Sequence, residues 1–146
     1  MSLSSLFDEN TFYQKFTNDL LNSSKEVIIE SPYITTERMK MLKPVFEELV
    51  SRGVKIYVLT RDPKEHNENL EVQSENEIHY FEVLGIQVLL CIGNHHRKLA
   101  ILDRKILWEG SLNILSQIKS REIMRRIDNK KLTVEMFNFL RFEEFI

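Results

Sequence analysis

The sequence predicts an α/β fold in which helices pack against a mixed β-sheet. Segments with helical apolar spacing alternate with short β-branched runs over the first 92 residues, and consecutive strand-like segments follow. Alternating strands and helices are typical of parallel pairing, whereas strands that follow one another directly pair antiparallel. We therefore expect an α/β sandwich with a mixed sheet.

Four segments have the apolar spacing of amphipathic helices: residues 10–23, 36–51, 74–84 and 132–145. Gly53 and Gly85 are well placed to end the second and third helices. Pro44 either kinks the second helix or lies in its first turns. Ser74 and Glu77 have capping-box spacing, which predicts that the third helix starts at Ser74 after an acidic loop.

Six apolar, β-branched runs predict strands: residues 26–31, 54–60, 86–92, 96–103, 106–110 and 121–127. The fourth and fifth form a hairpin that turns at Asp103 and Arg104. If Leu102 pairs with Lys105, Ser111 lies opposite His96 and Glu109 lies opposite Lys98.

One domain is expected for 146 residues, and the chain ends are compatible with a complete protein or with a domain cut from a longer one. The single cysteine, Cys91, excludes a disulfide framework and is expected to be an inert core residue. The sequence contains neither a secretory signal nor an apolar run of about 18 residues, so the cytoplasm is the expected location.

Charge is unevenly distributed along the chain, although the net charge is only −2. Residues 97–131 contain ten Lys and Arg against four Asp and Glu, and the rest of the chain is acidic. Such a basic segment attracts polyanions locally, or it is an ordinary solvated surface.

Polar residues with phosphate chemistry lie at one end of the predicted hairpin. Strand alternation directs His96 and Lys98 to one face and His95 to the other, which selects His96. Ser111 and Asn113 can converge on them, and Gly110 permits a close backbone approach. An imidazole beside an ammonium and two polar groups suits attack on phosphorus, and nothing in this stretch resembles a metal cage.

Asp103 lies seven residues from His96, on the order of 23 Å along an extended chain, which is too far to share a substrate atom. We expect it to be a turn residue whose carboxylate accepts backbone N–H bonds and pairs with Arg104 or Lys105.

The spacing His96-x-Lys98-x4-Asp103-x6-Gly110-Ser111-x-Asn113 resembles the HxKx4Dx6GSxN motif of the phospholipase D superfamily, and Glu122 lies where that family has a downstream acid. SPYIT and VKIYVLT also resemble the family's repeat unit. The resemblance implies an α-β-α sandwich with helices on both faces. It also implies a phosphodiesterase without cofactor or metal, in which a histidine forms a covalent phosphohistidine.

The resemblance further implies roles for individual residues. His96, Lys98 and Glu122 are catalytic; Lys98, Ser111 and Asn113 bind the phosphate; Asp103 and Gly110 are structural. The family usually has two motifs per chain, and this chain has one. Single-motif members resemble bacterial endonucleases, so we expect a homodimer with a shared site and a nucleic-acid substrate, DNA being favoured over RNA.

Two other functions remain open: a phospholipase D-like binding or dimerisation module with little turnover, and a lipid phosphodiesterase, against which the lack of an interfacial apolar segment counts. Trp108 is expected in the hairpin core, with base stacking as the alternative. His95 is expected to be a flanking residue and His66 and His79 to be surface residues. Glu122 could instead pair with a neighbouring arginine.

Overall fold

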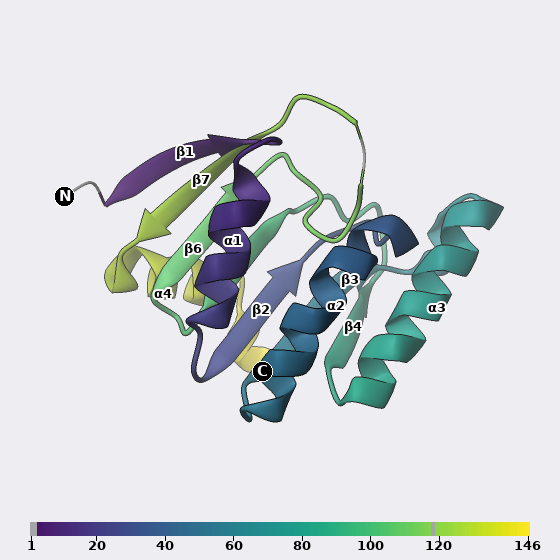
Figure 1. Ribbon diagram of the computed structural model, residues 1–146, viewed down its shortest axis with the longest axis horizontal. Coiled ribbons are helices and arrows are strands. Elements are labelled where there is room, and N and C mark those ends of the chain that lie inside the picture. The colour runs from purple at the N-terminus through teal and green to yellow at the C-terminus, as the bar shows by residue number, and fades with distance from the viewer. Residues whose placement is uncertain (1–2, 118) are drawn as a thin grey trace.

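The computed structural model describes residues 3–117 and 119–146, so residues 1–2 at the start of the chain lie outside the described residues. A seven-stranded mixed sheet runs through the protein. The strands are β1 Ser4–Asp8, β2 Glu26–Glu30, β3 Lys55–Arg61, β4 Gln87–Cys91, β5 Leu99–Leu102, β6 Ile106–Gly110 and β7 Ile123–Asp128. Their order is β1-β7-β6-β5-β2-β3-β4 (Figure 1). β2, β3 and β4 are parallel and the other pairs are antiparallel, which confirms the mixed sheet.

Helices cover both faces of the sheet, as expected for an α-β-α sandwich. They are α1 Phe12–Leu21, α2 Thr36–Ser51, α3 Glu68–Leu84 and α4 Lys130–Phe139, with short 3₁₀ turns η1 Pro63–Glu65 and η2 Phe142–Glu144. The first three helices lie in front of the sheet in Figure 1 and α4 lies behind it. Phe12, Phe46 and Phe81 belong to the larger core on the first face, and Phe137 belongs to a smaller core under α4.

The prediction that the third helix starts at Ser74 is wrong, because α3 starts two turns earlier. The Asn67 side chain caps it by accepting a hydrogen bond from the Leu70 N–H at 3.0 Å. Ser74 and Glu77 are buried inside the helix, where Glu77 pairs with Lys43 at 3.1 Å. The acidic stretch that suggested a loop consists largely of good helix formers, and Asn67 is the effective cap.

The chain termini also differ from the prediction. β1 was not predicted, since its short polar-apolar segment has little strand signal and is fixed by pairing with β7. The last helix ends at Phe139 rather than residue 145, and Arg141 adopts a left-handed conformation with φ 58° before η2. Pro44 lies in the middle of α2, not in its first turn. No helix in the described part of the chain is long and apolar enough to cross a membrane.

The β5–β6 hairpin turns where predicted, but its register is shifted by one residue. The Lys105 N–H donates to the Leu102 carbonyl at 3.0 Å, and Asp103 and Arg104 both have positive φ, as a tight turn of this type requires. Leu102 nevertheless pairs with Ile106, so Lys105 is an extra residue. As a result the Gly110 N–H, not Glu109, meets the Lys98 carbonyl at 3.3 Å.

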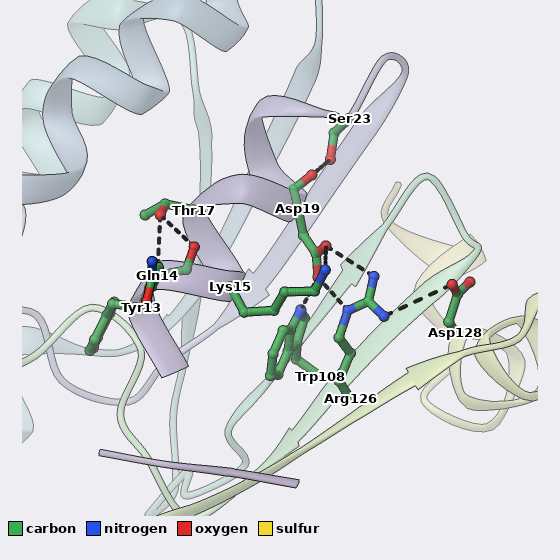
Figure 2. A network of polar contacts seen from close by, with 9 residues as sticks. All are labelled: Tyr13, Gln14, Lys15, Thr17, Asp19, Ser23, Trp108, Arg126 and Asp128. Carbon is green, nitrogen blue, oxygen red and sulfur yellow. Dashed lines mark hydrogen bonds and ion pairs between the residues drawn. The ribbon is translucent and has the colours of Figure 1, made fainter. Parts of the chain in front are cut away.

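A buried polar network joins α1 to the antiparallel half of the sheet (Figure 2). The Asp19 carboxylate accepts a hydrogen bond from Trp108 Nε1 at 2.9 Å and two from Arg126 at 2.7 and 3.0 Å. The Trp108 ring is fully buried among Phe7, Phe12 and Phe16. Trp108 is therefore a core residue as expected, and its base-stacking alternative is wrong.

Candidate active site

His95 and His96 lie on the loop of residues 92–98, which joins β4 to β5. β5 starts at Leu99 directly opposite Glu30, the last residue of β2, so the loop lies beyond the carboxyl ends of the parallel strands. In open α/β sheets this edge is where ligands usually bind.

A buried carboxylate holds the two residues that flank His96. Glu30 is fully buried, and its Oε1 lies 2.6 Å from His95 Nε2 and 2.8 Å from Arg97 Nη2. Arg97 Nε also donates to it at 3.0 Å. A charge buried this deeply requires such partners. Because His95 and Arg97 share one carboxylate, they point to the same side. The predicted strand at 96–103 is too long at its start, since β5 begins at Leu99 and these residues belong to the loop.

His95 is a structural anchor rather than a loose flanking residue. Hydrogen bonds to the Cys91 sulfur and to the Glu30 carboxylate raise the pKa of His95 to about 9, against a smaller opposing effect of burial. The histidine is therefore protonated at neutral pH and forms a true ion pair with Glu30. A cationic imidazole cannot act as a nucleophile.

We predict that this pair makes the stability of the protein depend on pH in mild alkali. An unfolded histidine titrates near pH 6.5, so the stabilising contribution of the pair is complete below about pH 6.5 and is lost as pH rises through about 9. Thermal unfolding from pH 6 to pH 10 measures it. Wild type should lose stability over that range more than His95→Asn does; parallel profiles would contradict the assignment.

His96 is exposed, in contrast to its neighbour. The Lys98 Nζ donates to the His96 backbone carbonyl at 2.7 Å, so the lysine side chain folds back over the histidine main chain. Within the described part of the chain, no hydrogen bond joins the side chains of the motif residues to one another. The imidazole of His96 is thus accessible to a ligand.

Lys98 and Ser111 both line an open groove of about 750 Å³, formed by the start of β5, the end of β6, the start of β7 and α4. Ser111 is tied to β7, since its Oγ accepts from the Ile123 N–H at 3.0 Å. A Cβ at Gly110 would lie 2.1 Å from the Ile123 carbonyl oxygen, so only glycine allows β7 this close. The structure brings Lys98, Gly110 and Ser111 together here, but His96, Asn113 and Glu122 do not line the groove.

Asn113 and Glu122 each have one buried oxygen without a hydrogen-bond partner in the described part of the chain: Asn113 Oδ1 and Glu122 Oε2. The other Glu122 oxygen accepts from Ser120 Oγ at 2.9 Å, and no ion pair joins Glu122 to an arginine among the described residues. Over residues 3–117 and 119–146, no hydrogen bond or ion pair joins it to a histidine either. Unsatisfied buried oxygens are rare, and each is free to accept a hydrogen bond from a ligand or a second chain.

Asp103 closes the far end of the hairpin, away from His96. Its carboxylate accepts backbone N–H bonds from residues 24, 25 and 26 at 2.8–2.9 Å, so it organises the start of β2. Burial alone would raise the pKa of Asp103, but hydrogen bonds from Glu26, Ser24 and Lys25 hold it below its usual value. The expected pairing with Arg104 or Lys105 is wrong, because Arg104 pairs with Glu26 at 2.9 Å.

A second set of residues, which the sequence did not reveal, fixes the start of the histidine loop. Glu65 accepts from the Gly93 N–H at 3.0 Å and from Arg61 Nε at 2.9 Å, and Arg61 Nη2 donates to Asn94 Oδ1 at 2.8 Å. The hydrogen bonds from Gly93 and then Arg61 hold the pKa of Glu65 below its usual value. The contacts of Glu65 with Gly93 and of Arg61 with Asn94 join residues about thirty positions apart, so no local sequence pattern predicts them.

The other two histidines and the single cysteine lie outside the motif in the sequence, and the structure shows how far each is buried. His79 is exposed as expected, whereas His66 is half-buried and its ring lies 5.0 Å from that of Tyr33. Cys91 is half-buried at the edge of the sheet rather than in the core. Across residues 3–117 and 119–146, no group of three or more His, Cys, Asp and Glu side chains is arranged to hold a metal ion.

Solved structures with a similar fold cover nearly the whole chain. NucT from Helicobacter pylori has a TM-score of 0.69 at 18% identity, over 93% of this chain and 91% of that chain. Nuc from Salmonella typhimurium, a phospholipase D family member, has a TM-score of 0.71 at 18% identity over the same shares. TrmBL2, an archaeal chromatin protein, has a TM-score of 0.64 at 15% identity, over 98% of this chain and 53% of that chain.

No curated protein matches the sequence. The model of the family described as cardiolipin synthase, PLD-like domain, matches residues 16–141, a range that includes the whole motif from His96 to Asn113. The family match, the fold and the motif spacing agree, and the chain belongs to the phospholipase D superfamily.

Proposed function

We propose that the chain is a metal-independent phosphodiesterase that cleaves nucleic acid through a covalent phosphohistidine on His96. The observation that carries this proposal is an exposed His96 in full motif spacing with Lys98, next to a groove that Lys98 lines. His95, the other histidine of the loop, is engaged by Glu30.

In the proposed reaction a neutral imidazole nitrogen of His96 attacks phosphorus. The nitrogen–phosphorus bond forms as the bond from phosphorus to the leaving oxygen breaks, and a second histidine gives its proton to that oxygen. Water then attacks the phosphohistidine and loses its proton to the second histidine, which restores both residues. Lys98, Ser111 and Asn113 stabilise the charge on the non-bridging oxygens.

The second histidine in this mechanism is the partner's His96, because one chain has only one motif. An isologous homodimer brings two copies of His96 and Lys98 to one site. Glu122 would orient a histidine of that site through its unpaired Oε2, which supports its role as a positioning carboxylate. In the proposed dimer, Glu122 Oε2, which has no hydrogen-bond partner among the described residues, accepts a hydrogen bond from that histidine.

Nucleic acid is favoured as substrate over lipid because the surroundings of the motif are basic. Arg121 and Arg125 line the same groove as Lys98. TrmBL2, which shares the fold, shows a mode of DNA binding. Lysines, instead of a divalent ion, would neutralise the charge of the phosphoryl group. We propose DNA as the first substrate to test and RNA as the second.

We predict that the protein cleaves end-labelled DNA or RNA at a rate that chelator leaves nearly intact, and that Lys98→Ala slows cleavage about 10²–10³-fold. Lys105→Ala is the matched control, since Lys105 is exposed at the opposite end of the same hairpin. Its rate should stay near that of wild type.

Three outcomes contradict the proposal in different ways. Activity that disappears in chelator and returns with Mg²⁺ or Zn²⁺ would exclude the metal-independent mechanism. Binding of nucleic acid without any cleavage would favour the module with little turnover. Hydrolysis of a phosphatidyl lipid, with no action on DNA or RNA, would favour the lipid phosphodiesterase.

A further inference from the structure

The groove beside Lys98 and Ser111 extends well beyond the space that one phosphate group needs. It has a volume of about 750 Å³ and crosses the sheet face that α4 covers, from the start of β5 to β1. A single phosphate group occupies only part of such a space. The groove can therefore hold a neighbouring portion of a substrate.

The groove is strongly basic on the side of the motif. Lys98, Arg121 and Arg125 line it against the single acid Glu109, and Arg97, which also lines it, is already paired with Glu30. They come from segments more than twenty residues apart, which the sheet aligns because β6 lies between β5 and β7. Arg121 and Arg125 are exposed, so they can reach a ligand. This arrangement suits a polyanion.

The other side of the groove presents large apolar side chains to solvent. Phe139, at the end of α4, is 78% exposed, Ile123 is 65% exposed and Leu6 is 62% exposed. An exposed aromatic ring beside arginines is the combination that proteins use to bind unpaired bases, which offer both a charged backbone and an apolar face. A duplex hides its base faces and offers mainly phosphates.

We propose that this groove binds a single-stranded segment of the nucleic acid next to the scissile phosphate, with Phe139 stacking on a base and Arg121 and Arg125 contacting phosphates. The inference rests on the proposed function, since Lys98 belongs to both sites. In the part of the groove that Arg121, Arg125 and Phe139 line, a second copy of the chain is a poorer occupant, because a twofold contact there would set the two arginines against the same two arginines.

Binding is measured by fluorescence anisotropy on the full chain carrying His96→Ala, with a labelled 12-nucleotide single strand and the duplex of the same sequence. Phe139→Leu keeps an apolar side chain but removes the ring, and should weaken single-strand binding about fivefold or more. Phe139→Trp keeps a ring and should bind at least as tightly as the unmodified residue. Duplex affinity should change less than twofold with either variant.

The arginine contacts have their own control. Arg121→Ala should lower the salt dependence of single-strand binding by about 0.7 in the slope of log affinity against log salt. Lys40→Ala removes an exposed cation from α2 on the other face of the sheet and should leave the slope unchanged. Equal slopes for both variants would overturn the proposed phosphate contact.

The outcomes separate this inference from the proposed function. If Phe139→Leu and Phe139→Trp bind the single strand equally, or if both strand forms lose affinity equally, the stacking site is wrong even when wild type cleaves DNA. If wild type cleaves nothing but single-strand binding still depends on an aromatic ring at position 139, the binding groove is supported and the proposed nuclease activity is wrong. A change of Phe139 that dissociates a dimer without altering affinity per chain would make the groove a protein interface and overturn the inference.

Discussion

Replacing His96 by alanine is expected to abolish cleavage, with a loss on the order of 10⁴-fold or more, because no other group can form the covalent intermediate. His95→Asn should keep most of the turnover of folded protein, since His95 is engaged by the buried Glu30 and is charged at neutral pH. Single-turnover rates for the two variants, measured with the folded fraction determined by circular dichroism, make the comparison.

The same variant tests whether two chains share one site. When equal amounts of wild type and His96→Ala exchange subunits, about one quarter of the dimers are wild type. If both histidines are needed in one site, activity per wild-type chain should fall to about half that of unmixed protein. Activity per wild-type chain that does not change on mixing would mean that each chain carries a complete site.

Replacing Asp103 by alanine is expected to cause the largest loss of stability among the charged and polar residues of the motif. Three backbone N–H groups lose a charged acceptor, and Ala also disfavours the positive φ of 52° at this position. We expect the free energy of unfolding to fall by about 2–4 kcal/mol, allowing for partial solvent exposure of the carboxylate. Urea denaturation measures the change.

Asp103→Asn is the matched variant, because asparagine tolerates positive φ and keeps one acceptor oxygen. It should lose less stability than Asp103→Ala, and the folded protein should turn over within a few-fold of wild type. The contribution of the Asp103 carboxylate to stability is present above about pH 4 and is lost as pH falls through its lowered pKa. The unfolding free energies of wild type and Asp103→Asn should therefore converge in acid. A stable Asp103→Asn protein as inactive as Lys98→Ala would instead place Asp103 in the chemistry.

The main elements could be predicted because their signals are local. The spacing of Phe12, Phe16 and Leu20 specifies one face of α1, and all three residues are fully buried. β1 could not be predicted, since pairing with β7 more than a hundred residues later decides its structure. The predicted start of α3 at Ser74 is wrong because Asn67 caps the helix, and the acidic stretch between the two residues, interpreted as a loop, is helical.

The site was predictable in residue types but not in contacts. Fixed spacing identified His96, Lys98, Gly110 and Ser111, and the last three do meet at one groove. A single extra residue, Lys105, was enough to displace every cross-strand pair in the predicted hairpin. The role of Glu30 could not be foreseen, because its partner residues follow more than sixty positions later and their meeting depends on the order of strands in the sheet.

The central claim is that His96 carries the phosphoryl group, and trapping the intermediate tests it most directly. Turnover of a substrate with a labelled phosphate can be quenched rapidly and digested at alkaline pH, where phosphohistidine survives, and the labelled peptide sequenced by mass spectrometry. The mechanism predicts one phosphoramidate per site, on His96, which disappears in His96→Ala. Label on His95, or full turnover with no label on any residue, would contradict it.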